Sequence, residues 1–172
     1  MSGYSAFQKP FKITGPDGTV YYEGAGKFGV LIEAETDTND GDGIEVGGAA
    51  IQDSATVVAG PYTPVTEYVE KLVVARVTAA ASVGFIGVAL NKFGIEGGKG
   101  ILAGSGSIVG VRCTSAAIQV GEHIIGSATA GLVAKDATSD PATGTVLGEC
   151  IKAAAQEGSS GNYFAGVYVN PS

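Results

Sequence analysis

Glycine is the feature of this sequence that most constrains its fold. The chain has 28 glycines among 172 residues, more than twice the usual share of about 7%. They follow no fixed period and stand among Val, Ile, Ala and Tyr, so neither a collagen triple helix nor a disordered linker fits. Frequent glycine among β-branched residues predicts many short strands joined by tight turns.

The second half of the chain alternates short apolar stretches with Gly, Asn, Asp, Ser or Pro. We predict strands at Val83 to Asn91, Gly100 to Ala103, Ser107 to Cys113, His123 to Ser127, Leu132 to Lys135, Thr145 to Ile151 and Tyr163 to Val169. A small polar loop is expected at Ala153 to Gly161. This density predicts a mainly β fold, a small β-barrel or β-tulip-like body of short antiparallel strands.

The first half is less regular. Residues 1–14 mix aromatic and basic side chains, which predicts an extended N-terminal arm or an edge strand, with a frayed terminus as the alternative. Gly15-Pro16-Asp17-Gly18 predicts a turn. Residues 15–172 then form the β-rich body, which can divide near residues 60–70, where helix and strand patterns compete. From residue 72, Leu-Val-Val-Ala-Arg-Val favours a strand.

The charge balance argues against several classes of partner. The formal net charge is −7, and the basic residues are scattered with no two adjacent. Nucleic-acid binding needs a basic surface that neutralises phosphates, and anionic membranes repel an acidic chain. We therefore expect no nucleic-acid and no membrane partner. Because the N-terminus lacks the apolar core of a signal peptide, we expect synthesis in a cytoplasm.

A glycine pattern near the N-terminus matches a nucleotide-binding signature in spacing only. Residues 24–29 read GxGxxG, and Glu45 follows at a plausible distance for a ribose contact. That chemistry needs a helix to begin at the motif, whereas Val30 to Ala34 has a strand-like pattern. We interpret this glycine pattern as part of a hairpin turn, with Glu23 to Lys27 between strands at Thr19 to Tyr22 and Phe28 to Glu35.

An acidic loop, Asp37 to Gly43, resembles a calcium-binding loop. An EF-hand requires Asp at position one, Gly at six and Glu at twelve, and no frame through Gly41 or Gly43 satisfies that spacing. A solvated turn is the simpler interpretation. An unrelated carboxylate cage for a cation at Asp37 to Asp42 is the alternative.

The remaining reactive side chains are few. His123 is the single histidine, no GxSxG elbow accompanies it, and Cys113 and Cys150 are far apart in the sequence. A nucleophilic triad or a zinc site needs a denser set. We therefore predict no catalytic, cofactor-binding or metal-binding residue, no cofactor and no enzymatic activity. Both cysteines are expected to be buried thiols rather than a disulfide.

Five glycine-containing apolar stretches follow one another in the second half of the chain. They are Phe85-Ile86-Gly87-Val88-Ala89, Val120-Gly121-Glu122-His123-Ile124-Ile125, Gly131-Leu132-Val133-Ala134-Lys135, Thr145-Val146-Leu147-Gly148-Glu149-Cys150-Ile151-Lys152-Ala153 and Phe164-Ala165-Gly166-Val167-Tyr168-Val169. In this order the stretches resemble the capsid decoration, or cement, proteins of tailed bacteriophages. The resemblance covers roughly residues 70–169, although Glu149-Cys150 departs from the Val-Ala that the family often has.

This resemblance implies a virion structural protein with no cofactor or reaction. Its partners would be the major capsid protein and two further copies of itself in a homotrimer. It would lie on the exterior of an icosahedral capsid after synthesis in the host cytoplasm, clamping neighbouring coat subunits. An arm containing Tyr4, Phe7 and Phe11 is the candidate for reaching a neighbour by strand addition.

Two alternatives remain at this point. The chain could be another β-rich virion component, such as a tail, fibre or head-completion protein. A small β-barrel enzyme or ligand binder is the other, and it predicts a concave pocket with convergent polar groups.

Overall fold

The computed structural model describes residues 8–14, 20–36, 43–52, 73–80, 82–94, 98–138, 140–156 and 163–172. All regular secondary structure in these ranges is strand, with no helix. The strands are β1 (Gln8–Thr14), β2 (Val20–Lys27), β3 (Leu31–Thr36), β4 (Ala49–Gln52), β5 (Val73–Arg76), β6 (Phe85–Ala89), β7 (Lys99–Ala103), β8 (Ile108–Cys113), β9 (His123–Gly126), β10 (Val133–Lys135), β11 (Val146–Gln156) and β12 (Tyr163–Val169).

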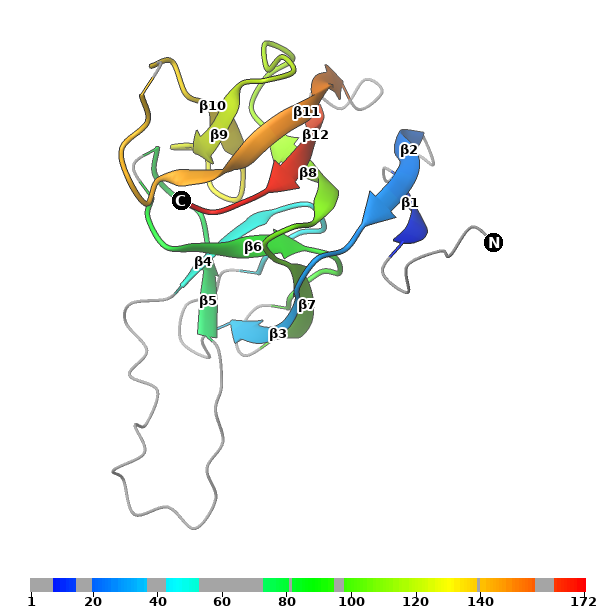
Figure 1. Cartoon of the computed structure of the whole chain (residues 1–172). Coiled ribbons are helices and arrows are strands. Elements are labelled where there is room, and N and C mark those ends of the chain that lie inside the picture. The colour runs from blue at the N-terminus through cyan, green and yellow to red at the C-terminus, as the bar shows by residue number, and fades with distance from the viewer. Residues whose placement is uncertain are drawn as a thin grey trace, which may run out of the picture.

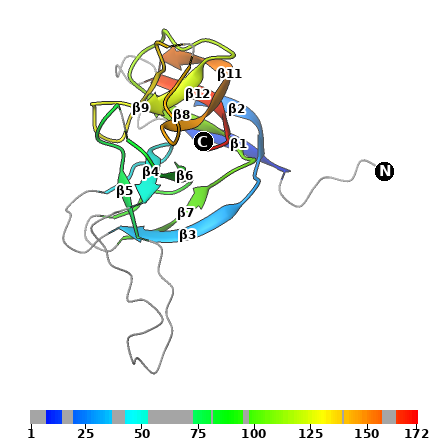
Figure 2. The same cartoon turned by 60° about the vertical axis from the view of Figure 1, so that its left-hand side comes forward.

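Ten of these strands form two closed barrels. The first barrel has the ring order β3-β5-β4-β6-β7, and the second has the order β8-β10-β9-β11-β12, closed by pairing of β12 with β8. Figures 1 and 2 show the second barrel above the first. The predicted fold class, a mainly β body built as small barrels, is confirmed.

The two barrels have the same topology and register. In each, the first strand of the barrel is parallel to the third, and every other neighbouring pair is antiparallel. The pairings are consistent around the whole ring when Leu31 is matched to Ile108, Ala50 to Ile124, Val74 to Val133, Gly87 to Gly148 and Ala103 to Tyr168. The chain therefore contains one five-stranded unit twice.

An irregularity in the strand pairing is also repeated. In the first barrel Ala50 is opposite Gly87 and Ile51 is opposite Phe85, which leaves an extra residue in β6. In the second barrel Ile124 is opposite Gly148 and Ile125 is opposite Val146, which leaves the corresponding extra residue in β11. Such a β-bulge bends a strand and increases its twist, which helps a five-stranded sheet to close.

Hydrogen bonds outside the strand ladders repeat at the matched positions. Each of the following bonds in the first barrel is given with its counterpart in the second: Gly47 N to Ala89 O with Gly121 N to Cys150 O, Ala89 N to Gly48 O with Cys150 N to Glu122 O, Phe93 N to Ile44 O with Ala154 N to Ile118 O, and Val77 N to Ala49 O with Asp136 N to His123 O. Donor–acceptor distances in these bonds run from 2.8 to 3.3 Å. The equivalence thus includes the turns that lead into β4 and β9.

The core explains why the two barrels form one body. One cluster of buried side chains, including Ala34, Ala50 and Leu102, lies in the first barrel. The larger cluster fills the second barrel with Val109, Val111, Leu147 and Val167, and it also includes residues from the first barrel. Those residues are Ala49, Val77, Phe85, Val88 and Ala103, which are all at most 6% exposed. The first barrel therefore packs its β4–β6–β7 side against the second.

A two-stranded hairpin extends beyond the barrels. β1 pairs antiparallel with β2 along its length, and β2 joins the second barrel through one position, Lys27 opposite Ile108. Figure 1 shows this hairpin at the side of the body. Residues 8–14 of the predicted arm therefore form an outer strand of the sheet.

The predicted strands of the second half are confirmed, whereas the predicted turn within residues 23–27 and part of the loop predicted at 153–161 are wrong. Residues 24–27 are not a turn, because β2 continues through them and pairs Gly24 with Phe11 and Gly26 with Lys9. Residues 153–156 are not a loop, because β11 extends to Gln156 through pairing with β12 and the Ala154 bond to Ile118.

Some predictions lie outside the described residues. These are the turn at residues 15–18, the acidic loop at 37–42 and the ambiguous segment at 61–69. The subdivision predicted near residues 60–70 also lies there, and β4 and β5 on its two sides are neighbours in the first barrel.

Candidate functional site

The contact between the barrels is made in part by a turn that precedes β4. Gly47 has φ +78°, a conformation that favours glycine, and its carbonyl accepts a hydrogen bond of 2.8 Å from the Arg112 amide of β8. A Cβ added to Gly47 would lie 2.9 Å from Phe164 Cε1 and 3.2 Å from the Gly110 carbonyl. The turn Glu45–Gly48 therefore covers the outward face of β8 and β12.

The matching turn of the second barrel, Gln119–Glu122, is exposed. Gly121 has a positive φ of +88°, like its counterpart Gly47. A Cβ added to Gly121, however, would meet no atom within 4 Å. Val120 at the tip of this turn is 64% exposed, whereas its counterpart Val46 is 37% exposed. One copy of the turn makes a contact within the molecule, and the other copy faces away from it.

Charged groups fix the conformation of the exposed turn. The Glu122 carboxylate accepts a hydrogen bond of 2.8 Å from Lys135 Nζ and another of 2.6 Å from the Gln119 amide. The Lys135 hydrogen bond, followed by the Gln119 amide, lowers the pKa of Glu122 from its ordinary value. The turn therefore presents a fixed shape at neutral pH.

The strand face beside the exposed turn is polar where its counterpart is apolar. Ala49, Val88 and Ala103 of the first barrel pack into the shared core. The register matches them to His123, Glu149 and Tyr168, which are all exposed. We call the turn Gln119–Glu122 together with these three residues the free front of the second barrel.

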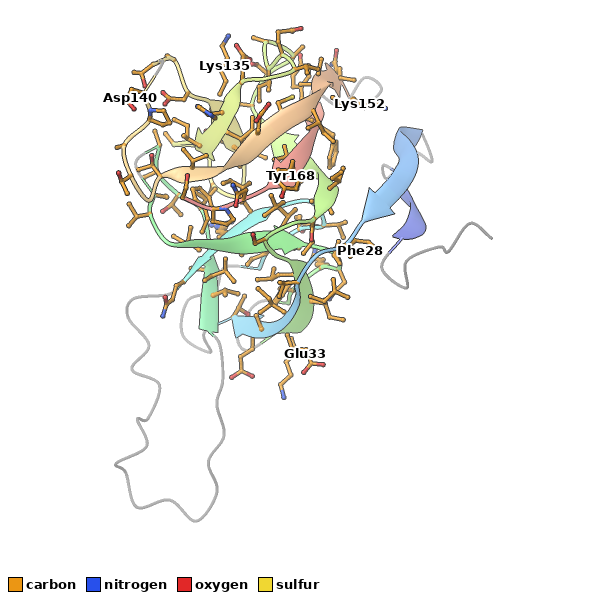
Figure 3. The ribbon with its side chains drawn as sticks, in the orientation of Figure 1. Phe28, Glu33, Lys135, Asp140, Lys152 and Tyr168 are labelled. Carbon is orange, nitrogen blue, oxygen red and sulfur yellow. The ribbon has the colours of Figure 1, made fainter. Side chains whose placement is uncertain are left out.

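A second uncovered surface lies on β3 and β7. The outward face of these strands carries Leu31, 47% exposed, and Ile101, 41% exposed, as diagonal neighbours across the strand pair. Exposed Glu33 and Lys99 lie beside them, and Figure 3 shows Glu33 at the end of the body opposite Lys135. This face matches the β8–β12 face that the Gly47 turn covers. We call it the free back of the first barrel.

The β1–β2 hairpin is a third surface. β1 is the outermost strand of its sheet in the described part of the chain. Phe11 of the predicted arm lies in β1, opposite Gly24, while Tyr4 and Phe7 lie outside the described residues. An outer strand offers backbone groups to which a further strand can be added.

His123 begins β9 and is exposed, and its carbonyl accepts a hydrogen bond of 2.9 Å from the Asp136 amide. The Thr138 amide and hydroxyl, each 2.9 Å from the Asp136 carboxylate, lower the pKa of that carboxyl. The structure thus places the histidine at the free front.

The two cysteines are buried free thiols, as predicted. Burial raises the pKa of Cys113 from 9.0 to about 12, and burial also raises the pKa of Cys150. A thiol that keeps its proton at neutral pH is a poor nucleophile. These side chains belong to the core of the second barrel.

Within the described ranges, no group of three or more His, Cys, Asp or Glu residues is placed to hold a metal ion. The Asp37 to Asp42 segment, for which a cation cage was the alternative, is outside those ranges. No helix in the described part of the chain is long and apolar enough to cross a membrane.

No family model, curated protein or solved structure matches this chain.

The paired turns were missed in the sequence although it contains a signal for them. Ile44-Glu45-Val46-Gly47 and Ile118-Gln119-Val120-Gly121 share three of four residues. A search for internal repeats would have found this pair. Only the structure shows that the first turn is covered by the second barrel while the second turn is exposed.

Proposed function

We propose that this chain is a viral structural protein that binds the outer surface of an icosahedral capsid and stabilises it by clamping neighbouring coat subunits. In this proposal it acts as a homotrimer, its further partner is the major capsid protein, and it catalyses no reaction. The sequence resemblance of residues 70–169 to phage decoration proteins is one support. Its acidic charge, −7, suits a place on the exterior, away from packaged nucleic acid.

The observation that carries the proposal is the β1–β2 hairpin. It joins the body through one paired position, Lys27 with Ile108. A two-stranded hairpin alone is marginally stable in water. Pairing with a strand of a coat subunit would supply the missing hydrogen bonds and order the hairpin, which is the behaviour expected of a clamp.

The exposed apolar side chains support the same function. Val30, Leu31, Ile101, Val120 and Ile151 are each at least 40% exposed. Apolar surface contributes about 25 cal/mol per Å² on burial, before the costs of association are subtracted. Many copies bridging a repeating shell gain further through avidity.

The test is to mix the purified protein with undecorated capsids and image them by electron microscopy. We expect ordered protrusions at threefold or quasi-threefold positions for the full chain. A chain lacking residues 2–12, which include most of β1, should lose at least tenfold in occupancy while its circular dichroism spectrum stays β-rich.

A Val83→Glu variant is the control for a general surface change, because Val83 is 59% exposed and lies outside the hairpin. Its occupancy should equal that of the unaltered chain. Unchanged occupancy after the deletion would contradict the role of the hairpin, and failure of the full chain to bind any shell would contradict the function.

A further inference from the structure

We propose that copies of this chain associate head to tail by repeating between molecules the contact that joins the two barrels within one molecule. The free front of one chain, around Val120 and Tyr168, would bind the free back of the next chain, around Leu31 and Ile101. This contact would hold together the homotrimer of the proposed function. Only the number of chains, three, rests on that function.

The first step of the argument is that the internal contact is not symmetric. The first barrel contributes the Gly47 turn and the β4–β6–β7 side, whereas the second contributes the outward face of β8 and β12 at Gly110, Arg112 and Phe164. Two copies of one unit therefore meet through different surfaces. Such a heterologous contact leaves one unused copy of each surface.

The second step is that both unused copies are exposed and carry apolar side chains. The front has Val120, 64% exposed, and Tyr168, 39% exposed. The back has Leu31 and Ile101, 47% and 41% exposed. Their counterparts in the internal contact include Ala103, which is fully buried, and Gly166, which is also buried.

The third step is the difference in chemistry between the two contacts. The internal front has Ala49 and Val88 where the free front has His123 and Glu149. An interface between separately folded chains carries polar groups and Tyr around a few apolar anchors, because each chain must remain soluble alone. The internal contact is never open to water in the folded chain.

Two charged residues of the free back, Lys99 and Glu33, stand where the internal contact has uncharged residues. Lys99 of the free back stands where the internal contact has Phe164, so a cation would approach the turn that ends at Glu122. Glu33 stands where the internal contact has Gly110. The intermolecular contact would therefore use the matched positions of the internal one. The turn and the strands would lie farther apart at Glu33, because a side chain stands there in place of glycine.

A head-to-tail contact produces a closed ring when the rotation between successive copies completes a circle, and an open chain otherwise. A trimer has interfaces of this kind. Three chains joined in this way would place six like barrels in one ring.

The experiment measures the molar mass of the full chain in solution by light scattering after gel filtration, with no capsid present. We expect a mass of at least two chains for the unaltered protein. Val120→Glu and Ile101→Glu should each raise the dissociation constant at least tenfold, because each replaces an exposed apolar side chain of the proposed contact with a carboxylate. Val83→Glu, the same change at another exposed valine, should leave the mass unchanged.

Mixing the two weakened variants separates this arrangement from a symmetric one. The Val120→Glu chain keeps its free back and the Ile101→Glu chain keeps its free front, so the mixture should form a one-to-one dimer that neither variant forms alone. All variants must keep the circular dichroism spectrum of the unaltered chain, because loss of association by itself lowers the unfolding temperature.

A monomeric unaltered protein at all concentrations would overturn the proposal. So would assembly that survives either substitution, or a mixture that stays monomeric at ten times the concentration at which the unaltered chain assembles. A closed trimer would support both proposals. Open chains would support the head-to-tail contact and contradict the homotrimer, and capsid binding is measured separately.

Discussion

At the scale of single residues, the two barrels place different side chains at one matched position. Thr36 ends β3 and Cys113 ends β8, and both are buried. The Thr36 hydroxyl donates a hydrogen bond of 3.0 Å to the Gly94 carbonyl and accepts one of 3.0 Å from the Gly98 amide. The Cys113 thiol donates a weak hydrogen bond of 3.7 Å to the Ser115 carbonyl, and burial is the largest cause of its raised pKa. The buried Thr36 hydroxyl thus has hydrogen-bond partners, whereas the buried Cys113 thiol stays in its neutral form.

The buried thiol predicts a dependence of stability on alkaline pH. Folding raises the pKa of Cys113 from 9.0 to about 12. Between these values the unfolded chain loses the thiol proton and the folded chain keeps it, so the free energy of unfolding falls as pH rises. The same direction applies to Cys150. Below about pH 8, where the unfolded thiols are also protonated, they should contribute little slope.

Denaturant unfolding at pH 8, 9, 10 and 11 measures this effect. Because lysines and tyrosines titrate in the same range, the control is Cys113→Ala, whose stability should fall less steeply than that of the unaltered chain. Parallel curves for the two proteins would contradict the prediction.

At the scale of single strands, the repeated bulges in β6 and β11 depend on glycine. A Cβ on Gly87 would lie 2.5 Å from the Ala103 carbonyl, and a Cβ on Gly148 would collide with the Tyr168 carbonyl. Gly87 corresponds to Gly148, and Ala103 corresponds to Tyr168. In both barrels the same close approach of two backbones requires a residue without a side chain.

We predict that Gly87→Ala and Gly148→Ala each lower the free energy of unfolding by about 2 kcal/mol, because the neighbouring strand must shift to admit a methyl group. Chemical denaturation measures the change. Gly94→Ala is the matched control, since its Cβ would be 3.6 Å from its nearest neighbour, Gly98 Cα, and should cost less than about 0.5 kcal/mol. A similarly small effect at Gly87 or Gly148 would show that the strands tolerate the methyl group.

The strands of the second half were predictable because turn residues separate them. Two strand boundaries were not predicted, the end of β2 and the end of β11. Both depend on pairing with another strand. Ala153 to Gln156 has weak strand propensity and becomes part of β11 through β12 and Ile118. Residues 24–27 remain in β2 because β1 pairs along them.

At the scale of the whole molecule, the shared core couples the two barrels. Val88 of β6 is fully buried in the cluster that also contains Val109 and Leu147 of the second barrel. Neither barrel can keep this cluster intact if the other unfolds. The two barrels should therefore unfold together.

We predict one calorimetric transition for the full chain. Its calorimetric enthalpy should equal its van't Hoff enthalpy, because the two barrels unfold as one cooperative unit. Val88→Ala should lower its free energy of unfolding by about 2 kcal/mol and move the whole transition to lower temperature. Two separable transitions, or a shift confined to the first barrel in hydrogen exchange, would contradict this coupling.

The small-barrel fold class was predicted from the sequence, but the division of the chain into two equivalent barrels was not. The matched turns share Ile, Val and Gly, and some matched strand positions are also identical, such as Val74 with Val133 and Gly87 with Gly148. Leu31 to Thr36 and Ile108 to Cys113, however, share no residue type at matched positions. Backbone pairing preserves the register while the outward side chains change with their surroundings. The exposed surfaces became evident only when covered and uncovered copies were compared.

The unequal spacing of the matched strands has a practical use. In the first barrel 21 residues separate Gln52 from Val74, and in the second only 6 separate Gly126 from Val133. The shorter connection already closes the same ring, so the extra length in the first barrel is not needed for closure. Because ring closure does not fix the length of the connection between β4 and β5, this connection is a place at which to insert an antigen or an affinity tag.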